Sequence, residues 1–316
     1  MMILDVVGPV FLLIGVGFLS VRVNLFPAAA VGGLVSFATN FAVPCLLFRA
    51  MLTVNFSTAF NPGFLVSFYV GAVAAFAVGA VTARYGFARS PGESVVVGFS
   101  AYFTNTVLIG LPIVQRAYGD AALPQIYAII GLHAPLLMSS GMIAMELARR
   151  DGEPIGRALL QAGQRIAANP LLIGIALGLS ANLLGIDLPG VIDSATEMMT
   201  KAVLPAALFG LGGALNQYKL RESYGLAVVA ALLKLLLHPL IALLLAVFVF
   251  GLSWELTRVA VLMAAIPPGL NVYLFATFYQ RATDVAANSI LVGTVLAVAT
   301  ISLWLFILEQ PGRWGW

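Results

Sequence analysis

Charged residues are scarce in this sequence of 316 residues. Asp, Glu, Lys and Arg together make up 9% of it, whereas soluble domains carry about 25%. Hydrophobic residues make up 61%, and the mean hydropathy is +1.02. Apolar runs of about twenty residues recur along the chain, and each can cross roughly 30 Å of hydrocarbon as a helix. The composition therefore predicts an all-α polytopic membrane protein surrounded by lipid.

Cysteine occurs once, at Cys45, and histidine only twice, at His133 and His238. This inventory excludes a disulfide framework and a cysteine-histidine metal cluster. The sequence also lacks a phosphate-binding loop, a dinucleotide-binding fingerprint and a set of residues suited to nucleophilic catalysis. The net charge of +3 comes from loops and does not indicate nucleic-acid binding. We therefore expect no enzyme activity, no cofactor, no metal site and no nucleic-acid partner.

Glycine, proline and charged residues divide the chain into ten expected spans. The first follows Asp5 rather than a basic stretch, so we interpret it as a retained helix and not as a secretory signal. A polar loop separates five spans from five, which predicts a first repeat over residues 1–150, a cytoplasmic linker over 151–168 and a second repeat over 169–316. The expected spans are 6–21, 31–52, 63–84, 95–118, 124–148, 169–186, 195–216, 223–250, 257–280 and 285–308.

The basic residues of the loops predict the orientation. With ten spans, both termini lie on one side, and the loops after odd-numbered spans lie on the other. The positive-inside rule places the richer side in the cytoplasm, so both termini are expected outside. The richer side holds Arg22, Arg84, Arg89, Arg149, Arg150, Arg157, Arg165, Lys219, Arg221 and Arg281, and the other side holds Arg49, Arg116, Arg258 and Arg313.

Two pairs of prolines recur in matching contexts of the two halves. Pro44 in TNFAVPCLLF and Pro205 in TKAVLPAALF are 161 residues apart, and Pro112 in TNTVLIGLP and Pro268 in AAIPPGLNVYLF are 156 apart. An odd number of spans in each half gives the halves opposite orientations, as in inverted-repeat transporters. We therefore expect a 5+5 inverted repeat.

The fourth and ninth expected spans combine helix-breaking residues with side-chain amides. A proline removes a backbone donor, and in hydrocarbon the affected group must find another partner. If the two spans break and cross, half-helix N-termini and amide donors converge near the midplane and can hold a carboxylate. The alternative is that these residues are ordinary packing devices of membrane helices. The residues concerned are Asn105, Gly110, Pro112, Pro267, Pro268, Gly269 and Asn271.

Three titratable side chains lie inside expected spans, whereas the acidic residues lie in loops or near span ends. Lys234 lies roughly eleven residues into its span, near the bilayer centre. It either adds positive potential to an anion site or bonds to backbone carbonyls in a scaffold helix. His238, one turn later, shares its face and either acts with it or bonds to backbone next to Pro239. His133 is a candidate for a binding or proton-linked role.

The motifs resemble the auxin efflux carrier family, which includes the plant PIN-FORMED proteins and bacterial organic-acid carriers. NTVLIGLPIVQRAYG resembles its NTxxxGxP-type span, and AAIPPGLNVYLFA resembles the partner span. The resemblance covers essentially the whole chain. It implies a scaffold domain and a transport domain that move in an elevator-like way. The short middle loop is that of bacterial members, which implies a bacterial-type inner (plasma) membrane.

The family pattern also implies a substrate site. The fourth and ninth spans would cross at Pro112 and at Pro267 or Pro268, with Asn105 and Asn271 close to the substrate. The double proline of IPPGLN leaves the second break open between two positions. His133 lies roughly where plant members have a glutamine. The other expected substrate-binding residues are Pro44, Leu47, Thr104, Gly110 and Gly269.

The leading hypothesis is a secondary transporter of a small organic anion, such as a dicarboxylate, a hydroxy acid or an auxin-like aromatic acid. A homodimer is a further expectation. A sodium-coupled symporter resembling the bile-acid carriers is an alternative, but it predicts carboxylate cation ligands at mid-membrane, which the sequence lacks. An intramembrane enzyme or receptor would need a catalytic set or a large soluble domain. The sequence names neither the substrate nor the coupling ion.

Overall fold

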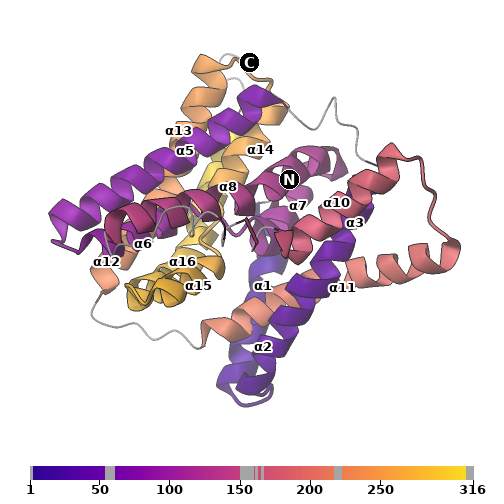
Figure 1. Cartoon of the computed structure of the whole chain (residues 1–316), viewed down its shortest axis with the longest axis horizontal. Coiled ribbons are helices and arrows are strands. Elements are labelled where there is room, and N and C mark those ends of the chain that lie inside the picture. Colours follow the sequence, from indigo (N-terminus) through magenta and orange to yellow (C-terminus); the bar gives the residue numbers. More distant parts are fainter. Residues whose placement is uncertain are drawn as a thin grey trace.

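The computed structural model describes residues 3–53, 61–149, 160, 163–164, 167–216 and 223–310. Within these ranges the regular structure is helical, apart from one isolated backbone bridge (Figure 1). Seven helices are long and apolar enough to cross a membrane. The prediction of an all-α polytopic membrane protein is therefore confirmed. Most of the expected linker lies outside the described residues, as do Arg150, Arg157, Arg165, Lys219, Arg221 and Arg313.

The helices of the first half follow the expected spans closely. Three of the expected spans contain a π-helical turn that runs directly into or out of an α-helix, and one of these three is also interrupted. In chain order the elements are α1 (Ile3–Arg22), α2 (Ala28–Phe37), η1 (Ala38–Ala42), α3 (Val43–Leu52), α5 (Pro62–Val81), η2 (Thr82–Gly86), α6 (Pro91–Tyr102), η3 (Thr106–Gly110), α7 (Leu111–Tyr118), η4 (Asp120–Ala122) and α8 (Leu123–Arg149).

The second half repeats this pattern of continuous and interrupted helices. Its largest departure from expectation is α11, which begins at Gly190 rather than near residue 195, directly after Pro189. The elements are α10 (Pro170–Leu183), α11 (Gly190–Leu215), α12 (Tyr224–Leu232), η5 (Leu233–Leu237), α13 (His238–Leu244), η6 (Leu245–Val249), α14 (Trp254–Ala264), α15 (Asn271–Tyr279) and α16 (Thr283–Leu308).

Side-chain caps fix the start of several helices. Asn61 accepts a hydrogen bond from Phe64 N at the start of α5. At the start of α6, Ser90 and Glu93 form a reciprocal capping box. Prolines follow both caps, where the missing N–H removes nothing that the helix uses. The local sequence therefore determines these helix boundaries.

The helices form two groups, each drawn from both halves of the chain (Figure 1). In the first group, α1 and α2 pack on α11, and α3 packs on α10 and α11. In the second group, α5 packs on α6, α13 and α14, α12 packs on α16, and α8 packs on α6. Glycine allows close contact within the first group, because a Cβ atom at Gly17 would lie 2.1 Å from the carbonyl oxygen of Phe209.

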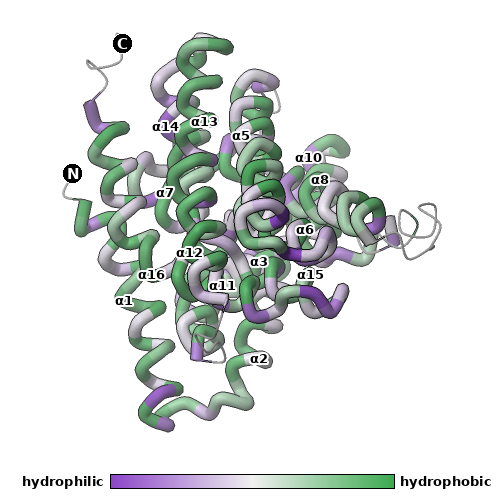
Figure 2. The backbone as a smooth tube through the Cα atoms, turned by 90° about the vertical axis from the view of Figure 1, so that its left-hand side faces the viewer, coloured by the Kyte–Doolittle hydropathy of each residue, from purple (hydrophilic) through white to green (hydrophobic). Residues whose placement is uncertain are grey.

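Large hydrophobic side chains are exposed along both groups. Examples are Leu12 in α1, Val73 in α5, Leu177 in α10 and Val295 in α16, each more than half exposed. Figure 2 shows that hydrophobic residues cover most of the length of the helices. A water-soluble protein would carry polar side chains at such positions. The exterior therefore suits a hydrocarbon environment.

Candidate functional site

The first interruption lies at Phe103–Asn105, between α6 and η3. Asn105 caps the helical segment that follows, because its Oδ1 atom accepts a hydrogen bond from Leu108 N at 3.3 Å. Pro112 lies in the first turn of α7, beyond this interruption. The prediction that the span breaks at Pro112 was therefore wrong. The π-helical turn of η3 precedes Pro112 and absorbs the missing hydrogen bond, so the helix continues through the proline.

The second interruption lies between Ala264 and Asn271 and contains Pro267 and Pro268. It lies directly against the first, as the sequence predicted for these two prolines. Asn105 N donates to the carbonyl oxygen of Pro267 at 2.9 Å. Thr104 and Pro268 form the antiparallel bridge. Two short extended segments therefore meet where two helices are broken, and we call this contact the crossing.

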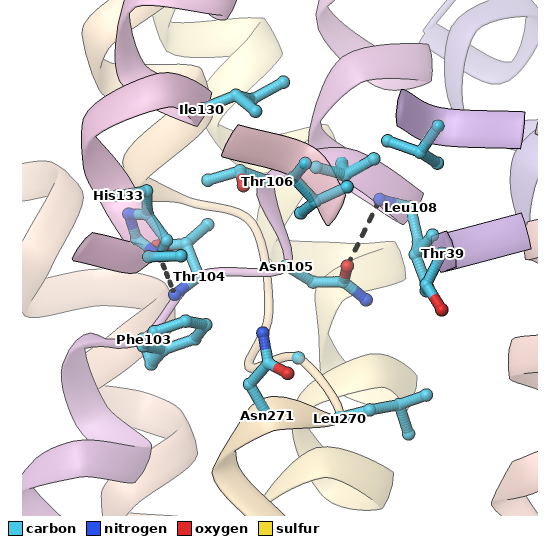
Figure 3. Close-up of a pocket in the computed structure, with 15 residues that line it drawn as sticks. Thr39, Phe103, Thr104, Asn105, Thr106, Leu108, Ile130, His133, Leu270 and Asn271 are labelled. Atoms are coloured by element: carbon cyan, nitrogen blue, oxygen red, sulfur yellow. Dashed lines mark hydrogen bonds between the residues drawn. The ribbon is translucent and has the colours of Figure 1, made fainter. Parts of the chain in front are cut away.

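Two further helices support the crossing. In α8, His133 Nε2 accepts a hydrogen bond from Thr104 N at 3.0 Å (Figure 3). In α16, Gly293 leaves room for the ring of Pro268, because a Cβ atom there would lie 2.7 Å from Pro268 Cδ. His133 Nε2 must be unprotonated to accept this bond. The break leaves the N–H of Thr104 without a helical acceptor, and the imidazole of His133 supplies one.

A cavity of about 90 Å³ lies beside the crossing. Residues from both interruptions line it, together with residues of η1, α3, α8 and α10 (Figure 3). Five predicted site residues are brought together here: Thr104, Asn105, His133, Gly269 and Asn271. Sequence reasoning missed the other lining residues, which are Thr39, Val43, Phe103, Thr106, Val107, Leu108, Ile130, Ala134, Leu171 and Leu270.

Two side-chain amides contribute hydrogen-bond donors to this cavity. Asn105 is 7% exposed, and its Nδ2 atom has no hydrogen-bond partner within the described part of the chain. Asn271, at the start of α15, is exposed and lines the same cavity (Figure 3). No carboxylate is among the described residues that line it. A buried amide without a partner costs about 1–3 kcal/mol, so the site suits a ligand that supplies an oxygen acceptor.

Other predicted residues lie away from the cavity lining. Leu47 is fully buried in the core. Pro44 lines a groove between α3 and α10, where its carbonyl oxygen would lie 2.5 Å from a Cβ atom at Gly174. A Cβ atom at Gly110 would lie 3.1 Å from Met263 Sδ. These positions therefore pack helices against one another in this structure.

The two titratable residues of the eighth expected span are fully buried and are not among the residues that line the cavity. Lys234 Nζ donates to the carbonyl oxygen of Ala264 at 2.5 Å. His238 Nε2 lies 3.0 Å from the carbonyl oxygen of Phe68. Of the two roles weighed for Lys234, the bond to a backbone carbonyl is present, and that carbonyl belongs to the last residue of α14.

A comparison with known proteins identifies the family of this chain. The model of the family described as "Membrane transport protein" matches residues 2–305. The chain belongs to this family. The resemblance to the auxin efflux carriers is thereby confirmed, and this transport protein is an integral membrane protein.

Three relatives match nearly the whole length of this transport protein. A Rhizobium meliloti (strain 1021) protein named "Putative malonate transporter" is 25% identical over 98% of this chain and 96% of its own. Auxin efflux carrier component 8 of Arabidopsis thaliana is 25% identical over 95% and 96%. The uncharacterized transporter YfdV of Escherichia coli (strain K12) is 25% identical over 95% of each chain. These relatives are named as transporters and not as enzymes.

Proposed function

We propose that this protein is a secondary transporter that binds a small organic anion in the cavity at the crossing. The observation that carries the proposal is the buried Nδ2 atom of Asn105, which has no hydrogen-bond partner within the described part of the chain. Asn271 adds a second amide, and the helical segments that start at Thr106 and Asn271 direct the positive ends of their dipoles toward this region. Malonate and auxin, which appear in the names of two relatives, are carboxylic acids.

We further propose ten membrane crossings in the inner (plasma) membrane, with both termini outside. Seven are the long helices. The others are α10, which at 14 residues spans about 21 Å, and the two interrupted spans. The inverted repeat, with halves at 1–150 and 169–316, is part of this proposal. Thr104 and Pro268, which pair at the crossing, are 164 residues apart, close to the 161 that separate Pro44 from Pro205.

Transport by an elevator-type movement fits the contacts between the two helix groups. Leu108, beyond the first interruption, packs on Ala38 of η1 and Ala207 of α11. Leu270, in the second interruption, packs against the cluster formed by Val21, Val31 and Ala214. The side chains of these two contacts are small or aliphatic, and no ion pair among the described residues joins the two groups. We propose that the second group, which carries the crossing, moves along this surface of the first group.

The two asparagines test the site. Losing a hydrogen bond to a charged group costs about 1.5–3 kcal/mol, or roughly 10- to 150-fold in affinity. We therefore expect N105A and N271A each to weaken binding of malonate, or of another carboxylate found by thermal-shift screening, by at least an order of magnitude. Asn40→Ala, which removes an exposed amide outside this cavity, serves as the matched control and should bind as the wild type does.

Asn105→Asp distinguishes the two roles of Asn105, which are to donate a hydrogen bond to the substrate and to cap the helical segment that follows. An aspartate keeps an oxygen that can accept from Leu108 N, so the start of η3 is retained, while the amide donor is replaced by a negative charge. We expect this variant to fold and to lose anion binding near neutral pH. Normal binding by all three variants would place the substrate elsewhere.

Sodium dependence distinguishes the second candidate function. A sodium-coupled symporter needs oxygen ligands for the ion, usually including carboxylates, but no carboxylate is buried among the described residues. We therefore expect uptake into proteoliposomes to continue when choline replaces sodium. Uptake that stops in choline would favour the symporter.

A further inference from the structure

Lys234 has a side chain that can carry a positive charge, and no counter-ion for it is buried among the described residues. It is the only Lys or Arg among the described residues that is fully buried, and no Asp or Glu among them is buried. It lies in η5, a π-helical turn between α12 and α13. A buried ammonium without an ion pair is expensive and is retained where it has a task.

The partner of Lys234 explains the position of the charge. In an unbroken helix, the carbonyl oxygen of Ala264 would accept a hydrogen bond from the N–H of residue 268. Residue 268 is a proline and has no N–H. The ammonium of Lys234 donates to this carbonyl at 2.5 Å. The side chain therefore satisfies the backbone acceptor that Pro268 leaves without a partner.

The site of this bond is the C-terminal end of α14, where the helix dipole favours positive charge. In other secondary transporters, the C-terminal carbonyls of broken helices coordinate the metal cation. We propose that the Lys234 ammonium takes the place of such a cation, so that the break between α14 and α15 is held by a positive charge built into the chain. The proposal concerns the architecture of the break and does not depend on the identity of the substrate.

Replacement of the side chain by a free cation tests this proposal. Lys234→Ala removes three methylene groups and the ammonium, which together match n-propylammonium in size and charge. We expect the apparent melting temperature of the purified variant, measured in choline chloride, to fall by several degrees. Added n-propylammonium chloride should raise it again in a saturable way, because a ligand that binds only the folded state stabilises it by mass action. Wild-type protein should show no such increase.

Two controls isolate the charge. Lys234→Met fills the same space without a charge, so it should melt below the wild type and should not respond to propylammonium. Propan-1-ol, a neutral molecule of the same size, should not stabilise Lys234→Ala. A response to sodium chloride in place of propylammonium would also support a cation position. An equal response to propan-1-ol, or no response to either cation, would overturn the proposal.

A second comparison applies if Lys234→Ala does not yield folded protein. Lys234→Arg keeps the positive charge and N–H donors, whereas Lys234→Met keeps only the bulk. A melting temperature near the wild-type value for Arg, with a lower one for Met, supports the built-in cation. A Met variant as stable as the wild type would overturn it, because the break would then need no charge.

Discussion

At the scale of single residues, His133 connects the sequence of α8 to the shape of the first interruption. Its ring packs edge-on against Phe103, with 4.7 Å between ring centroids, and its Nε2 atom accepts the Thr104 N–H. His133 is also one of the residues that line the cavity. Its first role in this structure is therefore to hold the backbone beside the site, and a direct contact with substrate remains a prediction.

Substitutions of His133 distinguish the role of its hydrogen-bond acceptor from the role of its imidazole ring. Glutamine offers a carbonyl oxygen that can accept the Thr104 N–H, whereas leucine leaves that donor buried without a partner, at a cost of about 1–3 kcal/mol. We expect His133→Leu to lower the melting temperature and to weaken substrate binding, and His133→Gln to retain most of both. Thermal unfolding and binding of the same purified samples would check this. Equal losses in the two variants would show that the imidazole itself is required.

At the scale of elements, π-helical turns precede three of the prolines that a helix passes through without a break. Pro44, Pro112 and Pro239 each lie two residues beyond such a turn, in η1, η3 and η5, and each helix continues. No π-helical turn directly precedes Pro267 and Pro268, which lie three and four residues beyond the end of α14, and these two consecutive residues lack N–H groups to continue it. A π-helical turn is one of the local adjustments by which a membrane helix accommodates the bond that a proline removes.

Glycine at the contact of α1 with α11 makes a testable contribution to stability. A Cβ atom at Gly17 would overlap the backbone of Phe209, whereas a Cβ atom at Gly15 in the same helix would meet nothing within 4 Å. Overpacking of this kind costs about 1–3 kcal/mol or more. We expect Gly17→Ala to unfold at a clearly lower temperature than the wild type. Gly15→Ala is the matched control and should be unchanged or slightly more stable.

At the scale of the whole molecule, the two helix groups meet at the cavity, and a tether between them tests the proposed movement. Leu108 and Ala207 lie on opposite sides of this boundary and belong to one buried cluster. In a Cys45→Ala background, we expect L108C/A207C treated with a short thiol cross-linker to lose transport while remaining folded. Val35→Cys/Gly210→Cys, within the first group, is the control pair. Full transport by the cross-linked L108C/A207C protein would exclude the elevator.

The orientation of the chain is tested by two positions with matched exposure. Tyr85, after the third expected span, is 82% exposed, and Val191, after the sixth, is 84% exposed. Single cysteines at these positions, in a Cys45→Ala background, should differ in their access to a membrane-impermeant thiol reagent applied to intact cells. We expect Val191→Cys to be labelled and Tyr85→Cys to be labelled only after the membrane is opened. The reverse pattern would invert the proposed topology.

The sequence by itself determined the membrane class, the approximate limits of the spans and the family, because these depend on apolar run length, local caps and short motifs. It also pointed to Asn105 and Asn271, since amides beside helix breakers are local features. The sequence also contained a signal that could have pointed to Thr39 as a site residue, because Thr39 is a polar residue shortly before Pro44 in the apolar span that contains TNFAVP.

Only the tertiary structure decided which side chains meet. In the structure the first break lies at Phe103–Asn105 and not at Pro112, because a π-helical turn accommodates the backbone hydrogen bond that Pro112 cannot donate. It brought Ile130 and Leu171 to the cavity from helices distant in sequence. It also placed Lys234 on the carbonyl that Pro268 leaves free. A sequence shows which backbone groups lose their helical partners, but the packing of helices determines which side chains replace them.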